Sequence, residues 1–327
     1  MSLTLLFWSA LNLKLSWAKG ARGPAVDWIG ATLRVLSKDG IPEGVSLSVM
    51  PDKISGLTEK INAFSGPLVE RSKVRDFAGF TSWIGSVIPA FRPYAQMVWA
   101  GAMARPSGRE SEEKVSLARL SLAFEWMAAF ASMRFSSIAR VFPLVTSRRL
   151  GPIVTFDASL DGGGATLHYT GEAEAPDEFC ATVWGPEDLR ALGVIENGPQ
   201  FQPLWEAYML LIALKTWSHL LMCHSGRIRI HGDAKGVLQS VVYGRAKQPA
   251  LNLIVAEMQL VLGGVFHDLR AAHFWSEEND VCDDLSRLHQ GVKLPSILEN
   301  AKHVSAKRNR WLLITYKNMR QKLVKKE

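Results

Sequence analysis

From residue 152 onward, short apolar runs rich in β-branched residues alternate with longer segments of helical periodicity. The runs that predict strands are PIVTFDAS, ATLHYT, FCATVW, RIRIHGDA and LRAAHFW. The segments that predict helices are PLWEAYMLLIALKTWSHLL, KGVLQSVVYG, ALNLIVAEMQLVLGG and a last helix from about Cys282. The glycines of LDGGG predict a turn between the first two strands. Three strands followed by alternating helices and strands predict a mixed α/β sheet with flanking helices.

The first 150 residues show a different pattern. The stretch AVDWIGATLRVL is strand-like, whereas PDKISGLTEKINAF begins with a proline and places Ile54, Leu57 and Ile61 on one helical face. Two further helical segments follow, and PLVTSRRLGPI has the proline, glycine and arginine content of a domain boundary. We therefore expect four parts: a hairpin-bearing segment 1–50, a mostly helical module 51–150, an α/β domain 151–295 and a basic tail 296–327.

Composition narrows the class of protein. The 327 residues are 47% hydrophobic, enough for two ordinary domains with real cores. The three cysteines lie far apart without a CxxC pair, which argues against a disulfide framework or a zinc site. No apolar run approaches the roughly 18 residues that span a bilayer, and the apolar opening lacks the basic start and cleavage site of a signal peptide. We expect an intracellular protein, cytoplasmic or nuclear, with no membrane partner.

Charge is distributed unevenly along the chain. The net charge of +7 divides into +8 for residues 1–150, −9 for residues 151–301 and +8 for residues 302–327. Basic flanks attract polyanions such as nucleic acid, and an excess of carboxylates suits divalent cations. The alternative is that these charges only solvate the surface, and for the C-terminal tail the two interpretations stay equally open.

Four acids stand where a predicted element begins or ends. Asp157 closes the first strand of the α/β segment, Glu206 opens its apolar helix, Asp233 closes the fourth strand, and Asp283 opens the last helix. Each has an ordinary structural explanation, because acids are favoured as helix caps, near helix N-termini and in turns.

Taken together, the acids indicate chemistry. The carboxyl ends of the first and fourth strands can lie side by side, and the helix that carries Glu206 must pack across the sheet. Three carboxylates at one partly buried point repel one another and lose hydration unless a cation lies between them. Oxygen ligands alone select a hard cation, Mg²⁺ or Mn²⁺. The pattern therefore predicts a metal site formed by Asp157, Glu206 and Asp233.

The same order of acids resembles the type 1 ribonuclease H family over most of residues 152–290. The sharpest match is HFWSEENDVCDDLSRL, in which His273, Asn279 and Asp283 have the spacing of the family's final His, Asn and Asp. The DDLSRL ending, and Asp157 and Ser159 in DAS, are similar to the version found in long-terminal-repeat retrotransposons.

This resemblance implies a fold, a cofactor and a set of residue roles. The fold is a ribonuclease H-like mixed sheet of five strands with flanking helices. Two Mg²⁺ or Mn²⁺ ions are bound, with Asp157 bridging both, Glu206 and Asp233 completing one site, and Asp283 the other. His273 assists proton transfer or product release. Ser159 and Asn279 contact substrate.

The upstream part resembles the end of a reverse transcriptase polymerase region. The stretch VDWIGATL is similar to a primer-grip hairpin, which makes Trp28 and Gly30 candidate substrate-binding residues. KVRDFAGFTSWIGSVIPAFRPYAQ is similar to the thumb and connection helices of retrotransposons. Nothing before Val26 matches the acids of a polymerase palm, and the single Asp-Asp pair, Asp283 and Asp284, belongs to the other site. A polymerase portion encoded upstream is therefore an expected partner.

The resemblance implies a hydrolase, an endonuclease that cleaves the RNA strand of RNA–DNA hybrids as the C-terminal part of a retroelement reverse transcriptase. Two alternatives remain: a catalytically decayed ribonuclease H-like module that only binds nucleic acid, and an integrase-like strand transferase, which the order of the four acids disfavours. Among lone residues, His231 and Trp205 are expected in the core and Asp161 in a turn. The segment from Gly171 to Gln202 has no place in the family pattern.

Overall fold

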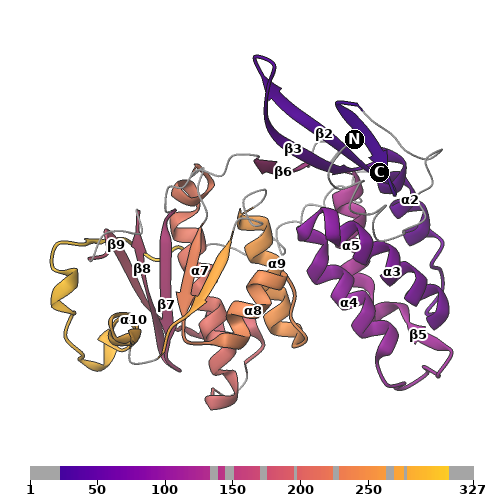
Figure 1. Cartoon of the computed structure of the whole chain (residues 1–327). Helices are drawn as coiled ribbons and strands as arrows, with labels where there is room; N and C mark the ends of the chain where they lie inside the picture. Colours follow the sequence, from indigo (N-terminus) through magenta and orange to yellow (C-terminus); the bar gives the residue numbers. More distant parts are fainter. Residues whose placement is uncertain are drawn as a thin grey trace, which may run out of the picture.

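The computed structural model describes residues 23–132, 139–143, 151–169, 175–194, 197–223, 228–262, 269–275 and 278–308. The apolar opening, most of the expected boundary segment and the end of the basic tail lie outside these residues. Figure 1 shows the described chain as two parts, a helical part with a long hairpin and a sheet with helices packed on it. Each part has its own large hydrophobic core.

The first sheet of the described residues has antiparallel strands in the order β1-β2-β3-β6. Their bounds are Ala25–Trp28, Ala31–Lys38, Ile41–Val49 and Ala139–Pro143. Ile29 and Gly30, between β1 and β2, both have positive φ, at 49° and 80°. Two such residues make the tight turn that matches the twist of a two-stranded ribbon. The strand-like stretch predicted here is thus a hairpin.

The described residues of the second predicted part contain four helices. Their bounds are α2 Pro51–Asn62, α3 Arg71–Val87, α4 Arg92–Met103 and α5 Ser121–Ser132, with the short paired strands β4 Leu68–Glu70 and β5 Lys114–Ser116 between them. Pro51 is the first residue of α2, and Ile54 and Leu57 are buried on the face that their spacing predicts, whereas Ile61 is half-buried. The core of this part also takes in Ala256 of a later helix.

The sheet of the second half has six strands in the order β11-β10-β7-β8-β9-β12. Their bounds are β7 Ile153–Ala158, β8 Gly162–His168, β9 Glu178–Val183, β10 Arg229–Gly232, β11 Arg270–His273 and β12 Lys302–His303. β7, β8 and β9 pair antiparallel, whereas β10 and β11 continue parallel to β7. The predicted mixed α/β sheet is confirmed. It has one strand more than the five expected, because β12 pairs parallel with β9.

The three glycines of LDGGG lie in a strand and not in the turn predicted from the sequence. Gly162, Gly163 and Gly164 lie inside β8, and the turn is confined to the residues before them. A Cβ on Gly164 would stand 2.2 Å from Cβ of Leu285, and one on Gly163 would stand 2.6 Å from Sδ of Met209. The glycines are therefore needed because helices approach both faces of the strand closely.

The helices of the second half pack on those two faces. Their bounds are α6 Pro186–Leu192, α7 Gln202–Cys223, α8 Lys235–Tyr243, α9 Pro249–Leu262 and α10 Asp280–Ser286. Met209 of α7 and Leu285 of α10 mark opposite faces of β8. α7 is apolar around most of its circumference, and Trp205 and Trp217 are fully buried in the core, as expected for a helix enclosed between a sheet and other helices.

Helix α9 joins the two parts. In Figure 1 it lies with α8 between the sheet and the helical part. The Asn252 side chain, 2% exposed, donates Nδ2–H to the carbonyl of Pro93 over 2.8 Å and accepts the Ala246 N–H. Among the described residues no helix is both long and apolar enough to cross a membrane.

The fold continues past the boundary expected at residue 295. Lys302, the first residue of β12, forms an ion pair with the buried Glu178, and Arg308, beyond β12, forms one with the buried Asp188. Two basic residues of the predicted tail therefore anchor the chain to the sheet. Residues 309–327 lie outside the described part.

Candidate metal centre

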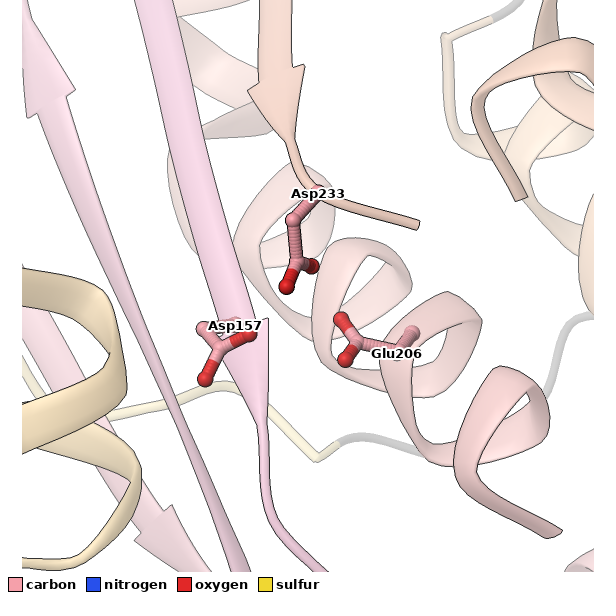
Figure 2. A group of neighbouring side chains, drawn as sticks. All are labelled: Asp157, Glu206 and Asp233. Carbon is pink, nitrogen blue, oxygen red and sulfur yellow. The ribbon is translucent and has the colours of Figure 1, made fainter. Parts of the chain in front are cut away.

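Three acids meet at one end of the sheet. Asp157 is the second-last residue of β7, and Asp233 directly follows β10, whose register pairs His231 with Thr155. The fifth residue of α7, Glu206, reaches the same place from a helix that packs on the sheet. One carboxylate oxygen of each acid lies within 4.8 Å of the others. Figure 2 shows the three side chains converging.

The electrostatics of this group are unfavourable without a cation. Burial raises the pKa of Asp157 to about 8, and the charges of Asp233 and Asp283 act in the same direction. Burial likewise raises the pKa of Glu206 well above its ordinary value, again supported by its acidic neighbours, Asp157 and Asp233. Buried like charges cost free energy. Apolar side chains at these positions would therefore give a more stable fold, unless the charges have a function.

Glu206 has an incomplete set of partners. Its Oε1 accepts a hydrogen bond of 3.1 Å from Nε2 of Gln202, whereas its buried Oε2 has no hydrogen-bond partner within the described chain. A buried carboxylate oxygen without a donor is costly. The residues therefore fit a metal ion: three carboxylates supply hard oxygen ligands, and one of those oxygens lacks any other partner.

Gln202 sets the position of Glu206. Its Nε2 also hydrogen-bonds the carbonyl of Ala158, the residue after Asp157. One amide thus connects the end of β7 to the acid on α7. The sequence analysis missed this residue, although its place one helical turn before Glu206 is a usable signal.

Asp283 lies beside the group but outside the set of three. It is the fourth residue of α10 and does not open it, because the helix begins at Asp280. Its charge contributes to the raised pKa of Asp157. Its Oδ2 also accepts a 2.6 Å charge-assisted bond from Arg287, one turn later. This arginine was not anticipated as a partner of the fourth acid.

His273 occupies a different position from the acids. It is the last residue of β11, paired with Gly232, and its ring contacts Trp275 edge to face at 5.3 Å. The side chain lines a cleft with residues of α8. In this conformation His273 is a neighbour of the acidic group and not a member of it.

Ser159 and Asn279 make structural contacts. The Ser159 hydroxyl lies within hydrogen-bonding distance of Gly162 and of the Ser286 carbonyl at the end of α10. Asn279 is 2% exposed and donates to the Phe156 carbonyl over 3.1 Å, while its Oδ1 is buried without a partner in the described chain. Both residues hold α10 against β7 next to Asp157, and their predicted contact with substrate stays a prediction.

Trp28 and Gly30 lie on the hairpin, in the other part of the molecule. The Trp28 side chain is 65% exposed. A Cβ on Gly30 would come within 3.0 Å of Lys53 and 3.2 Å of Trp83. The positive φ and this close approach explain the glycine structurally, and the exposed indole remains available for a partner. Their predicted role in substrate binding stays a prediction.

Two residues expected in the core are found there. Trp205 is fully buried and His231 is 8% exposed. Burial lowers the pKa of His231 to about 4, with further contributions from Arg229 and His168, so this imidazole is neutral at pH 7.

Comparison with known proteins yields little. No family model matches the sequence, and no curated protein matches it. Among solved structures, the foamy viral protease-reverse transcriptase in complex with dsDNA is 11% identical with a TM-score of 0.28, covering 78% of this chain and 45% of that chain. The same viral protein in complex with an RNA/DNA hybrid gives 11% identity and a TM-score of 0.27, covering 88% and 32%. The chain thus spans less than half the length of these two viral chains.

Proposed function

We propose that the acidic group binds divalent metal ions and that the protein cleaves the RNA strand of RNA–DNA hybrids, as the C-terminal part of a retroelement reverse transcriptase. The observation that supports the metal site is the convergence of Asp157, Glu206 and Asp233 around a buried Glu206 oxygen that has no donor among the described residues. The choice of hybrid rests on the sequence resemblance to type 1 ribonuclease H.

In this proposal Asp157, Glu206 and Asp233 hold one Mg²⁺ or Mn²⁺, and Asp157 with Asp283 holds a second. Bound ions of this kind activate a water and stabilise the leaving 3′ oxygen of a phosphodiester. Gln202 keeps the Glu206 carboxylate turned toward Asp157.

The other residues orient substrate and move protons. His273, at the edge of the sheet beside Gly232, exchanges a proton with the reacting strand or assists its release. Because its ring contacts Trp275, that role needs a change of rotamer or a substrate that reaches toward β11. The 2′-hydroxyl and the hybrid's shape supply the choice of strand.

One observation favours the alternative, a module that binds nucleic acid without cutting it. The Arg287 guanidinium already neutralises Asp283, and a permanent pair there would remove the second ion's ligand. The pair is half-exposed, however, and such pairs are weak. The nuclease and the binding module therefore differ in whether a metal ion displaces this arginine from Asp283.

The test is cleavage of a labelled RNA–DNA hybrid by the folded chain with Mg²⁺ or Mn²⁺. We expect cleavage of the RNA strand, its loss on chelation, poor cleavage of single-stranded RNA, and no primer extension. Asp157→Asn removes cleavage, whereas Asp161→Asn, the same change at an exposed turn position four residues later, leaves it unchanged. An intact hybrid under both metals, with the protein shown to be folded, would establish the binding module instead.

A further inference from the structure

A cleft borders the acidic group on the side of β11. It has a volume of about 330 Å³, within the range of small-ligand sites. One wall is a single face of α8, whose residues recur at helical spacing: Lys235, Leu238, Gln239, Val242 and Tyr243. The other wall is β11, at the end of the sheet's strand order.

The cleft begins where the metal centre ends. Lys235 lies two residues after Asp233 and donates its backbone N–H to the Asp233 carbonyl over 3.0 Å. From the other wall, His273 pairs with Gly232, the residue before Asp233. Adjacent strands are about 5 Å apart, so a strand of nucleic acid lying on the acids passes this cleft within about one nucleotide.

Aromatic rings at the cleft are unusually exposed. Tyr243 is 62% exposed and Trp275 is 65% exposed. The Trp275 ring has the Lys235 ammonium 5.1 Å from its centre and the His273 ring against it. Proteins bind an unpaired base by stacking it on an exposed aromatic ring, and they bind its phosphate with a nearby cation. Both elements are present beside this apolar cleft.

The charge of the cleft narrows the choice of ligand. Residues 151–301 have a net charge of −9, yet the residues that line the cleft include one lysine and one histidine and no acid. An anionic ligand with an apolar ring satisfies both the cation and the aromatic surface. A plain apolar peptide leaves Lys235 without a counter-charge.

We propose that this α8–β11 cleft binds an unpaired nucleotide of a single-stranded segment adjoining the duplex, with its base stacked on Trp275 or Tyr243 and its phosphate on Lys235. The inference deepens the proposed function, because it gives the nuclease a preference for hybrids that carry a single-stranded extension. Binding at the cleft itself does not require metal.

The experiment measures binding of a fluorescent deoxyadenylate hexamer by anisotropy in chelator. Base stacking contributes about 1–3 kcal/mol per base, so loss of the ring that holds the base, by Trp275→Ala or by Tyr243→Ala, weakens binding by about 5- to 150-fold. Trp275→Phe and Tyr243→Phe retain a ring and most of the affinity. Lys235→Gln reduces the salt slope by about 0.7, the value for one phosphate contact on a single strand.

Matched controls lie outside the cleft. Lys247→Gln removes an exposed lysine beyond the end of α8, and Met103→Ala removes a side chain that is 65% exposed on α4. Neither changes affinity. Inorganic phosphate does not compete at the concentrations at which the hexamer binds, because it offers no base to stack.

Failure of the cleft proposal can be distinguished from failure of the nuclease proposal. Asp157→Asn retains hexamer binding even though it loses cleavage, so loss of the nuclease leaves the cleft's role standing. Unchanged hexamer affinity in both alanine variants, with thermal melts like wild type, overturns the inference. So does an absence of hexamer binding by the wild type, including the case in which an apolar peptide binds there instead.

Discussion

Glu178 and Glu206 lie in the same part of the molecule and are almost equally buried, at 4% and 5% exposure, but their surroundings are opposite. Glu178 accepts hydrogen bonds from Tyr169 Oη at 2.7 Å, Trp217 Nε1 at 2.8 Å and Lys302 Nζ at 3.1 Å. Burial alone would raise its pKa, yet these donors outweigh burial and lower it.

Around Glu206 the fold supplies one donor and two like charges. Gln202 hydrogen-bonds one oxygen, the other has no partner in the described chain, and Asp157 and Asp233 face it. Burial and these neighbours raise its pKa. Where this fold uses a buried carboxylate for stability, it satisfies the charge. Where it leaves one unsatisfied among other acids, we propose that a cation is the missing partner.

The largest effect is expected from Glu206→Gln. It removes a metal ligand, so hybrid cleavage falls by at least about 100-fold, since even residues that only orient metal ligands are worth 10- to 100-fold. The metal-free fold keeps or gains stability because repulsion is relieved. Single-turnover cleavage and thermal melts measure the two effects. A variant that cuts like wild type would remove Glu206 from the site.

Glu178→Gln should give the opposite result. It weakens hydrogen bonds to a charged group, each of which contributes about 1.5–3 kcal/mol, so we expect a loss of about 2 kcal/mol in the free energy of unfolding. Metal affinity should be unchanged, because the group lies outside the acidic cluster. Urea unfolding and metal titration measure the two quantities. Reduced metal affinity with unchanged stability would show that Glu178 serves the metal site and not the stability of the fold.

In the metal-free protein, the contributions of Asp157 and Glu178 to stability should change in opposite directions with pH. Asp157 has a folded pKa raised from 3.8 to about 8, so its contribution to stability is fully present below about pH 4 and is lost as pH rises toward 8. Glu178 has a folded pKa below its ordinary 4.5. Its contribution is present above that value and is lost as pH falls through the lowered pKa.

Melting curves from pH 3 to 9 test these signs. Asp157→Asn should flatten the decline that occurs as pH rises from about 4 to 8, and Glu178→Gln should flatten the decline that occurs as pH falls below 4.5. Metal affinity of the wild type should rise as pH increases toward about 8, because the ligand must lose its proton. If the decline between about pH 4 and 8 persists in Asp157→Asn, another group causes it.

The smallest effect concerns Arg287. Its half-exposed pair with Asp283 contributes about 0.2–1 kcal/mol, so Arg287→Met should tighten binding of a second ion by about 1.5- to 5-fold. Lys293→Met, the same type of change at an exposed residue outside the pair, should have no effect. Weaker binding of the second ion in Arg287→Met would show that the arginine supports the site.

Much of this architecture follows from the chain's pattern. The β-branched runs, the apolar width of α7 and the positions of Asp157, Glu206 and Asp233 at element ends are local signals, and they were enough to predict a mixed sheet with three acids together. The turn expected at LDGGG is present at Leu160 and Asp161, but placing the glycines in it was wrong, because glycine serves loops and close packing alike. Only the three-dimensional approach of Leu285 and Met209 distinguishes the two.

Other features depend on contacts between residues distant in sequence. Lys302 and Arg308 look like part of a free basic tail, but they pair with Glu178 and Asp188 more than 100 residues earlier. The place of His273 beside α8 likewise depends on how β11 packs. Spacing in the sequence predicts that such a histidine lies near the acids, but it does not predict which way the ring turns.

The central claim is that Asp157, Glu206 and Asp233 form a metal site. Calorimetric titration of the metal-free protein with Mg²⁺ and with Mn²⁺ near pH 8, for wild type, Glu206→Gln and Glu178→Gln, tests it most directly. We predict saturable binding with proton release in wild type and Glu178→Gln, and its loss in Glu206→Gln while that variant melts at or above the wild-type temperature. Equal binding in all three proteins, or none in the folded wild type with either ion, would contradict the claim.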